Sequence, residues 1–290
     1  MNLVVGATGL LGSEICRLLA TEGKTTRALV RTTSEQSKVA ELESLNIEIV
    51  FGDLKQRASL EAACQGADAV ISTASSTLSR QEGDSIQTVD LEGQLNLIHA
   101  AKAGNVRHFV LISFPQAAVE FPLQDAKRAV EDSLKNSDLN YTILQPTNFM
   151  EVWLSPALGF DAANATARIY GSGENKISWI SYKDVAKFAV ASIDNSETRN
   201  AVIELGGPEA LSPLEVLRIF EKVKGQKFDI QHVPEEALRE QRESAIDPLQ
   251  QSFAGLMLNY SQGSIVDMQE TLQKFPMRLA SIKDYAQASM

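Results

Sequence analysis

The stretch GATGLLG, residues 6–12, decides the fold of this 290-residue chain. It follows the apolar run NLVV (residues 2–5) directly and opens an amphipathic segment. Gly6, Gly9 and Gly12 allow, in turn, a tight exit from a strand, a close approach of backbone to a pyrophosphate, and close packing of a helix on the strand. The spacing predicts a dinucleotide-binding turn between a first strand and a first helix.

Peptide N–H groups of this turn are the expected ligands of the phosphates. The first N–H groups of a helix have no partner within the helix, and they lie at the positive end of its dipole. We therefore expect the pyrophosphate to be bound by the glycines together with the peptide groups of Thr8, Leu10 and Leu11.

Strands and helices alternate after this turn. Apolar, β-branched runs predict further strands at residues 26–30, 47–51, 68–72, 108–113 and 141–145. Helical patterns lie between them, near 35–44, 57–64, 86–103 and around Lys127, and Gly104 is placed to end one of them in a left-handed cap. Continuous apolar runs are typical of strands that are buried on both faces. The alternation predicts an α/β fold of the Rossmann type, with a doubly wound parallel sheet.

The end of the second predicted strand indicates which dinucleotide binds. An NAD site usually carries Asp or Glu here, roughly 20 residues after the glycines, to bind the ribose 2′-hydroxyl. This chain has Arg31 instead, followed by Thr32, Thr33 and Ser34. A guanidinium binds a 2′-phosphate and stacks on adenine, and we expect no carboxylate here to repel that phosphate. The pattern predicts NADP(H); the alternative that Arg31 is only a solvated strand end stays open.

Two more strand ends are expected beside the cofactor. GDL (residues 52–54) follows the third strand, and its Asp53, next to Leu54, has two roles open to it. It can accept a hydrogen bond from the adenine amino group or cap the next helix. STAS (residues 72–75) follows the fourth strand, so we expect Thr73 and Ala74 beside the nicotinamide half of the dinucleotide.

The second half of the chain returns to the sheet. SYKDVAKFAVASI (181–193) predicts a helix and NAVIELGG (200–207) predicts a further strand. SPLEVLRIF (212–220) begins like a helix, with a Ser cap, Pro at the first position and Glu three residues after the cap. We expect an NADP-binding Rossmann core of residues 1–155, completed by 178–207, and a smaller C-terminal substrate-binding lobe of residues 156–177 and 208–290.

Composition narrows the classes of function. The net charge of −10 disfavours a nucleic-acid surface. Two cysteines and three scattered histidines give neither a disulfide framework nor metal-ligand spacing, so no metal is expected. No stretch approaches the roughly 20 apolar residues that span a bilayer. The first residues run straight into the glycine motif without a targeting pattern, so we expect a cytoplasmic protein.

Together these residues resemble the NmrA-like group of atypical short-chain dehydrogenases/reductases, which includes isoflavone-reductase-like and quinone-reductase-like proteins. The resemblance covers at least residues 1–155. It rests on GATGLLG, the basic end of the second strand, GDL, VLIS (110–113), AKRAVEDSL (126–134) and YTILQPTNFME (141–151). Family members typically read Arg-Pro-Gly where this chain has Gln145, Pro146 and Thr147, a departure that concerns the geometry on the substrate side.

The resemblance implies a role for one lysine. Many related reductases carry a tyrosine four residues before it as the proton donor, but this chain has Leu123 there. In this group the tyrosine is commonly missing, while the lysine contacts the nicotinamide ribose and in some members is proposed as the acid–base group. Those roles fall on Lys127, with Ser113 nearby as a second catalytic candidate. From the residues alone, Lys127 and Glu131, spaced i, i+4, can equally form a surface ion pair.

Two classes of function fit these features. The first is an NADPH-dependent reductase of a quinone, enone or similar conjugated acceptor, which delocalises charge and so tolerates the loss of the tyrosine. The second is a non-catalytic NADP(H)-binding redox sensor or assembly factor that acts on a partner protein. We expect a monomer or homodimer that contacts neither nucleic acid nor membrane. Residues expected to form an apolar wall for a flat acceptor, or only to pack between core and lobe, are Phe114, Asn148, Phe149, Met150 and Trp153.

Overall fold

The computed structural model describes residues 1–77 and 80–289, and the chain divides into two compact units. Unit 1 comprises Met1–Ser113, Leu123–Gln145 and Val185–Ile203, and unit 2 comprises Phe114–Pro122, Pro146–Asp184 and Glu204–Met290. The division differs from the predicted boundaries. The core ends at Gln145, and it resumes at Val185, because side chains between these positions, such as Trp179, belong to the hydrophobic core of unit 2.

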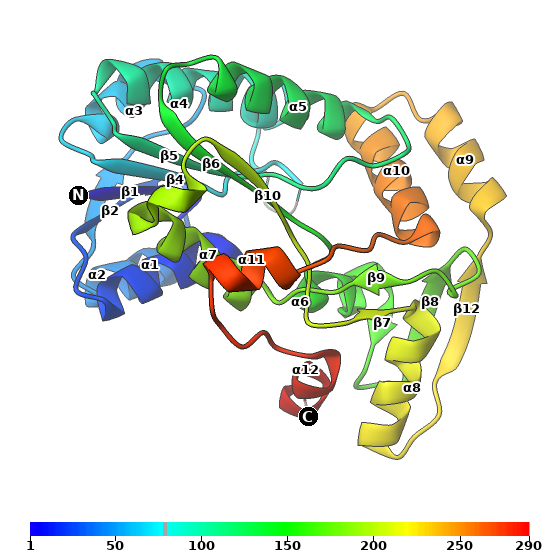
Figure 1. The fold of residues 1–290 in the computed structure, drawn as a ribbon. Coiled ribbons are helices and arrows are strands. Elements are labelled where there is room, and N and C mark those ends of the chain that lie inside the picture. The colour runs from blue at the N-terminus through cyan, green and yellow to red at the C-terminus, as the bar shows by residue number, and fades with distance from the viewer. Residues whose placement is uncertain (78–79, 290) are drawn as a thin grey trace. The chain divides into compact units, whose positions relative to one another are not determined.

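A seven-stranded sheet forms the centre of unit 1 (Figure 1). Its strands are β1 (Asn2–Val5), β2 (Thr26–Val30), β3 (Glu48–Phe51), β4 (Ala69–Ser72), β5 (His108–Ile112), β6 (Asn140–Pro146) and β10 (Ala201–Leu205). The order is β10-β6-β5-β4-β1-β2-β3, and the pairs from β6 to β3 are parallel. The sheet runs outward in both directions from β1, so the predicted doubly wound topology of the Rossmann type is confirmed.

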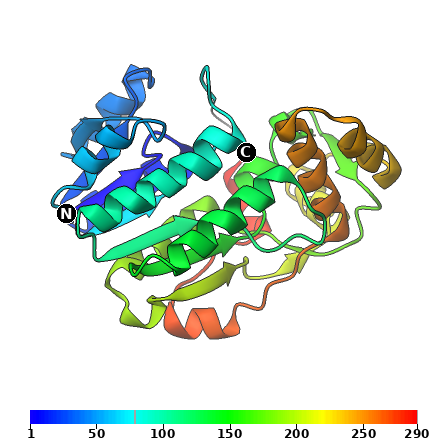
Figure 2. The ribbon, with the colours of Figure 1, turned by 90° about the horizontal axis from the view of Figure 1, so that it is seen from above.

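Helices cover both faces of this sheet. The helices of unit 1 are α1 (Leu10–Thr21), α2 (Gln36–Ser44), α3 (Arg57–Cys64), α4 (Glu92–Ala103), α5 (Pro122–Lys135), α7 (Tyr182–Asp194) and the short 3₁₀ turn η3 (Ser196–Thr198). Figure 1 shows α3, α4 and α5 on one face and α1, α2 and α7 on the other, and Figure 2 looks onto the first of these faces. Strands β1, β4 and β5 between them are completely buried, as their apolar runs predict.

The predicted helix over residues 86–103 has two parts. It begins as a π-helix, η1 (Ile86–Leu91), and continues as α4. The predicted left-handed cap at Gly104 is wrong by one residue: Gly104 has a φ of −81°, and Asn105 has the left-handed φ of 55°. A Cβ at position 104 would lie 3.0 Å from the carbonyl oxygen of Cys64, a tight contact that a glycine avoids.

The two cysteines belong to the core of unit 1. Cys16 and Cys64 are both fully buried. Burial raises the pKa of each thiol to about 12, so both stay protonated at neutral pH. Because the thiolate is the reactive form, both cysteines act as small apolar side chains.

Unit 2 contains two small sheets and a set of helices. The sheets have the orders β12-β8-β7 and β11-β9. The elements are β7 (Phe160–Asp161), β8 (Thr166–Tyr170), β9 (Ile177–Ser178), β11 (Ala210–Leu211), β12 (Asp229–Val233), α6 (Met150–Trp153), η2 (Pro156–Leu158), α8 (Pro213–Lys224), α9 (Glu235–Ser244), α10 (Pro248–Gln262), α11 (Gln269–Lys274) and α12 (Ile282–Ala288). None of the helices in the described ranges is long and apolar enough to cross a membrane.

Local sequence signals in unit 2 agree with its structure. Helix α8 begins with the predicted capping box, in which Ser212 and Glu215 each accept a hydrogen bond from the other's peptide N–H. It ends at Gly225, whose φ of 68° is left-handed. Its buried side packs Phe220 into an aromatic core that also contains Trp179 and Tyr260. Unit 2 therefore has a hydrophobic core of its own.

Candidate dinucleotide site

The glycine loop joins β1 to α1 in unit 1. Gly6 has a φ of 84°, and a Cβ there would lie 2.6 Å from Thr73 Oγ1. A Cβ at Gly12 would lie 2.1 Å from the carbonyl oxygen of Gly6, so this glycine lets the helix pack against the strand. Gly9 is the N-cap of α1, in an extended conformation. The geometric roles predicted for Gly6 and Gly12 are thus present.

The loop before α1 and its first turn contain the peptide groups that are expected to bind the phosphates. The side chain of Leu11 is buried in unit 1, whereas Leu10 is exposed, so any contact of these two with a phosphate uses the peptide groups. Such N–H groups at a helix start have no intrahelical acceptor. The phosphate roles of Thr8, Leu10 and Leu11 are untested by this geometry and stay predictions.

The turn after β4 is held from within the fold. Thr73 lies next to the glycine loop, with its Oγ1 donating to the carbonyl oxygen of Val5 at 3.2 Å. Gln94, which is buried, accepts from Ser72 Oγ at 2.8 Å and donates to the Ala74 carbonyl oxygen at 3.0 Å. The predicted nicotinamide-side residues, Thr73 and Ala74, are therefore fixed beside the glycine loop.

Asp90 links the same turn to Lys127. One of its carboxylate oxygens, Oδ2, accepts from Ser76 N at 3.0 Å and from Ser76 Oγ at 2.6 Å. The other, Oδ1, lies 3.6 Å from Lys127 Nζ, and it is buried with no hydrogen-bond partner in the described part of the chain. The side chains of Asp90 and Lys127 are 0% and 7% exposed. A separation of 3.6 Å is an ion pair without a hydrogen bond, so the lysine keeps N–H groups for a ligand.

Asp90 comes from the π-helix η1. Such a turn inserts one extra residue into a helix, and π-helical turns are frequent at functional sites. The alternative in which Lys127 forms a surface ion pair with Glu131 is excluded. Lys127 is buried and its ionic partner is Asp90, while Glu131 contacts Arg128 at 2.9 Å.

A second buried polar cluster surrounds Ser113. Arg128 Nη2 donates to Ser113 Oγ at 3.0 Å. Glu131, with a side chain only 2% exposed, receives the Arg128 contact and also accepts from Gln145 Nε2 at 2.9 Å. The glutamine that stands where family members typically have arginine therefore fills a buried position. It contacts the carboxylate that orients Arg128.

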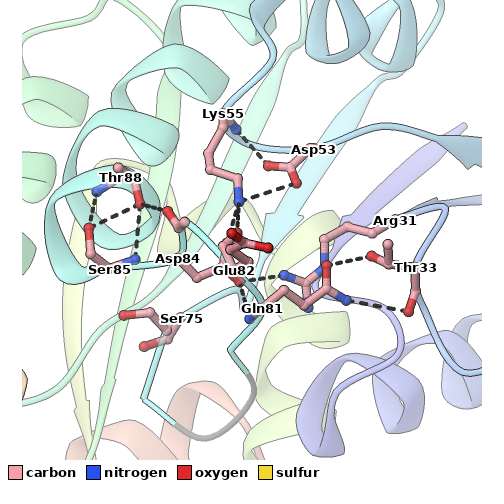
Figure 3. A network of polar contacts seen from close by, with 12 residues as sticks. Arg31, Thr33, Asp53, Lys55, Ser75, Gln81, Glu82, Asp84, Ser85 and Thr88 are labelled. Atoms are coloured by element: carbon pink, nitrogen blue, oxygen red, sulfur yellow. Dashed lines mark hydrogen bonds and ion pairs between the residues drawn. The ribbon is translucent and has the colours of Figure 1, made fainter.

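The basic end of β2 has a partner that is distant in sequence. Arg31 Nη1 donates to Asp84 Oδ2 at 2.6 Å, and Lys55 Nζ donates to Asp84 Oδ1 at 2.5 Å. The N–H of Gln81 also donates to Asp84, at 3.0 Å, and the Gln81 side chain accepts from Thr33 Oγ1. Figure 3 shows Arg31 and Lys55 converging on this carboxylate from two sides.

This arrangement excludes one alternative and corrects one expectation about Arg31. Its side chain is 27% exposed and tightly paired, so it is not merely a solvated strand end. The expectation that no carboxylate lies there is also wrong, since Asp84 follows Arg31 by 53 residues and touches its guanidinium. Thr32, the other predicted residue at this strand end, is exposed.

The charge state of Asp84 follows from these contacts. Burial by itself would raise the pKa of this carboxyl group. Hydrogen bonds from Lys55, the Gln81 N–H and Arg31 outweigh burial and hold the pKa below its ordinary value. Asp84 is therefore an anion at neutral pH, and it neutralises part of the positive charge at the end of β2.

The structure excludes one of the two roles that were left open for Asp53 in the GDL segment. Asp53 accepts from the Lys55 N–H at 2.8 Å, which makes a local turn. The N-cap of α3 is Gln56, so the capping alternative for Asp53 is excluded. The adenine contact of Asp53 stays a prediction. The side chain of Leu54 belongs to the hydrophobic core of unit 1, which leaves only its peptide groups for a cofactor.

The predicted acceptor residues all belong to unit 2. Phe114 stacks on Phe121 with ring centroids 5.9 Å apart. Trp153 stacks on Tyr260 at 4.9 Å. Asn148 is buried, and its carbonyl oxygen accepts from the Ile180 N–H. Phe149 precedes α6 as its N-cap. The side chains of Phe114 and Trp153 thus pack within unit 2, and the role of all four residues toward a substrate stays a prediction.

Sequence reasoning missed four charged residues of this site: Lys55, Asp84, Asp90 and Arg128. Of these four, Arg128 could have been found from the sequence, because it directly follows the lysine of AKRAVEDSL. Asp84 and Asp90 lie in DSIQTVD (84–90), which has no recognisable ligand spacing. In the ranges that the structure describes, no group of three or more His, Cys, Asp and Glu side chains is arranged to hold a metal ion.

Comparison with known proteins identifies one family model and named relatives that cover most of the chain. The sequence model of the NmrA-like family matches residues 2–273. The photosystem II assembly factor Ycf39 of Synechocystis sp. is 33% identical over 240 residues, which cover 82% of this chain and 72% of that protein. The NAD(P)H azoreductase of Xenophilus azovorans is 32% identical over 229 residues, covering 78% of this chain and 74% of the azoreductase.

A solved structure supports the fold. The NADPH complex of the NADPH-dependent quinone oxidoreductase of Escherichia coli superposes with a TM-score of 0.81. The match covers 100% of this chain and 99% of that one, at 23% sequence identity. Such a likeness confirms the Rossmann-type architecture, and function must be argued from the residues of the site.

Proposed function

Because the chain belongs to the NmrA-like family, we propose that it is an NADP(H)-dependent reductase of a quinone, enone or similar conjugated acceptor. The observation that carries the proposal is the buried ion pair between Lys127 and Asp90, next to the turn that follows β4. Burying a charged lysine whose N–H groups are not all hydrogen-bonded destabilises the fold, so such a lysine indicates a function in binding a ligand. The azoreductase among the relatives is a reductase by name.

NADP(H) fits the polar groups of unit 1. Gly9 lies at the start of α1, where we assign the pyrophosphate, and we assign Arg31 and Lys55 as the two cations that bind a 2′-phosphate. When bound, NADPH supplies the hydride. The chain has to bind the dinucleotide, orient the nicotinamide end and stabilise the charge that develops on the acceptor.

We assign the orienting role to Lys127. Its ammonium group donates to hydroxyls of the nicotinamide ribose, and Asp90 holds the ammonium in place. Ser113 is assigned to the acceptor. Its hydroxyl oxygen accepts from Arg128, which directs the serine's own proton elsewhere and makes it a better donor to an acceptor oxygen. A conjugated acceptor delocalises the negative charge that hydride transfer creates. The Ser113 hydroxyl is therefore a sufficient donor, although Leu123 stands where related reductases carry the tyrosine.

The alternative is a protein that binds NADP(H) without turnover and acts on a partner protein. Two observations favour it: Leu123 in place of the tyrosine, and relatives named as photosystem II assembly factors. The cytoplasmic location also stays a prediction, since one relative is named as chloroplastic.

One experiment separates the two functions. Anaerobic NADPH oxidation is measured against a panel of quinones and enones, alongside calorimetric titration with NADPH and NADH. The Gly9→Val variant is the control, because a branched side chain would block the pyrophosphate while the fold survives. Turnover by the wild type, absent in Gly9→Val, supports the reductase. Tight NADPH binding without turnover on any acceptor supports the non-catalytic alternative.

A further inference from the structure

Asp84 forms ion pairs with Arg31 and Lys55, the two cations that the proposed function assigns to the 2′-phosphate. Its oxygens lie 2.6 Å from Arg31 Nη1 and 2.5 Å from Lys55 Nζ, and its side chain is only 2% exposed (Figure 3). Carboxylates and phosphates bind cations through the same charge-assisted hydrogen bonds. Asp84 therefore presents to Arg31 and Lys55 the kind of ligand that a nucleotide phosphate presents.

The neighbouring polar groups at the end of β2 are engaged by the same segment. Gln81 accepts from the hydroxyl of Thr33 and donates to the Thr33 carbonyl oxygen at 3.4 Å. Ser85 begins η1 with a capping box formed with Thr88, so residues 81–85 continue directly into the π-helix. Asp84 therefore directly precedes the N-cap of η1, and this connection places its carboxylate beside the two cations without any ligand.

We propose that Asp84 is a specificity-determining residue, an internal anion that competes with the 2′-phosphate for Arg31 and Lys55. A phosphate that binds these cations must displace the carboxylate, because two anions on the same donors repel each other. A dinucleotide without the 2′-phosphate makes no such demand. Asp84 therefore lowers the affinity for NADP(H) selectively and reduces the preference over NAD(H). The inference rests on the proposed function, in which Arg31 binds that phosphate.

The test is Asp84→Asn, which keeps the shape and the acceptor oxygen for the Gln81 N–H but removes the charge. We expect NADPH and 2′,5′-ADP to bind about tenfold more tightly, the effect of one charge-assisted contact, with NADH changed by less than about twofold. Asp138→Asn is the matched control. It removes the same charge from a side chain that is 86% exposed and paired with Lys102, near the start of β6.

A measurement on the wild type keeps the proposal testable if the variant folds poorly. In hydrogen exchange, the backbone of residues 80–88 should exchange faster when the protein is saturated with NADPH than when it is saturated with NADH. Equal exchange in the two complexes would mean that Asp84 is not displaced, and it would overturn the proposal.

The failures of the two proposals differ. Weaker or unchanged NADPH binding in Asp84→Asn, with the preference still lost in Arg31→Ala, would show that Asp84 positions the arginine, and it would overturn the competition alone. If Arg31→Ala also left the ratio of NADPH to NADH affinity unchanged, Arg31 would not bind the phosphate. The cofactor part of the proposed function would then fail.

Discussion

Two aspartates only six residues apart, Asp84 and Asp90, contact cations at the two ends of the proposed dinucleotide site, and they do so differently. Asp84 is saturated, with hydrogen bonds of 2.5 and 2.6 Å to Lys55 and Arg31. Asp90 has one oxygen without a hydrogen-bond partner in the described residues, 3.6 Å from Lys127. The cations that contact Asp84 are about a quarter exposed, whereas Lys127 is buried.

The difference shows that an ion pair can affect the availability of its cation for a ligand in two opposite ways. A tight pair that solvent reaches competes with a ligand for its cations. A loose, buried pair holds its cation in place and leaves that cation's donors available. In the proposed site, the same short segment therefore pairs tightly with the cations assigned to the 2′-phosphate and loosely with the lysine assigned to the nicotinamide ribose.

The sharpest test of this comparison is stability. Asp90→Ala leaves Lys127 buried without its partner, so we expect a loss of about 3–5 kcal/mol in the free energy of unfolding. Asp84→Ala should cost less, about 1–2 kcal/mol, because water reaches Arg31 and Lys55. Urea unfolding measures both. The double variant Asp90→Ala/Lys127→Met should recover much of the loss, and equal costs for the two single variants would contradict the distinction.

The loose pair is next tested by its cation. Lys127→Ala should weaken NADPH binding and lower turnover by about 100-fold, since hydride transfer depends on alignment. Lys127→Arg separates orientation from proton donation, because a guanidinium keeps the charge but cannot release a proton. Leu123→Tyr should add little for a conjugated acceptor. Titration and steady-state rates are the measurements.

Lys102→Ala provides the control, since that lysine is 54% exposed and pairs with Asp138 at 2.7 Å. It should leave binding and rate unchanged. Normal binding and turnover in Lys127→Ala would show that the buried pair is only structural, and it would remove the observation on which the proposed function rests.

The saturated pair is tested through cofactor preference. Arg31→Ala should weaken NADPH binding by about tenfold or more, the worth of one charge-assisted contact, and leave NADH binding unchanged. Calorimetric titration with both dinucleotides gives the ratio. Arg57→Ala, which removes an exposed arginine paired with Glu61, is the control. An unchanged ratio of NADPH to NADH affinity in Arg31→Ala would contradict the predicted role of Arg31.

The smallest expected effect is on the pH dependence of stability. Because the pKa of Asp84 is lowered from 3.8, its carboxylate stabilises the fold above that pH, and the contribution is lost as the pH falls through the lowered value. Asp84→Asn should therefore be less stable than the wild type near neutral pH, by about 1 kcal/mol. The gap should close in the acid range. Urea unfolding at about pH 7, 5, 4 and 3 measures it, and a gap that widened in acid would reverse the assigned sign.

Most of the fold of unit 1 was predictable from sequence because its signals are local. The glycine turn depends on three residues within seven positions, and the apolar runs of β1, β4 and β5 directly report strands buried on both faces. The capping box of α8 is likewise contained in four consecutive residues. The domain boundary was less accurate, because Trp179 and its neighbours are apolar in either unit and only packing assigns them.

The sequence by itself determined the Rossmann architecture, the loss of the tyrosine at Leu123 and the basic end of β2, since each is carried by residues close together in the chain. Only the tertiary structure decided what those cations contact. The partner of Arg31 is 53 residues away and that of Lys127 is 37 residues before it, across different βα units. Charge interactions depend on distance in space and on burial, and neither can be read from spacing along a chain. The parallel sheet brings these side chains together by placing the ends of consecutive strands at one edge.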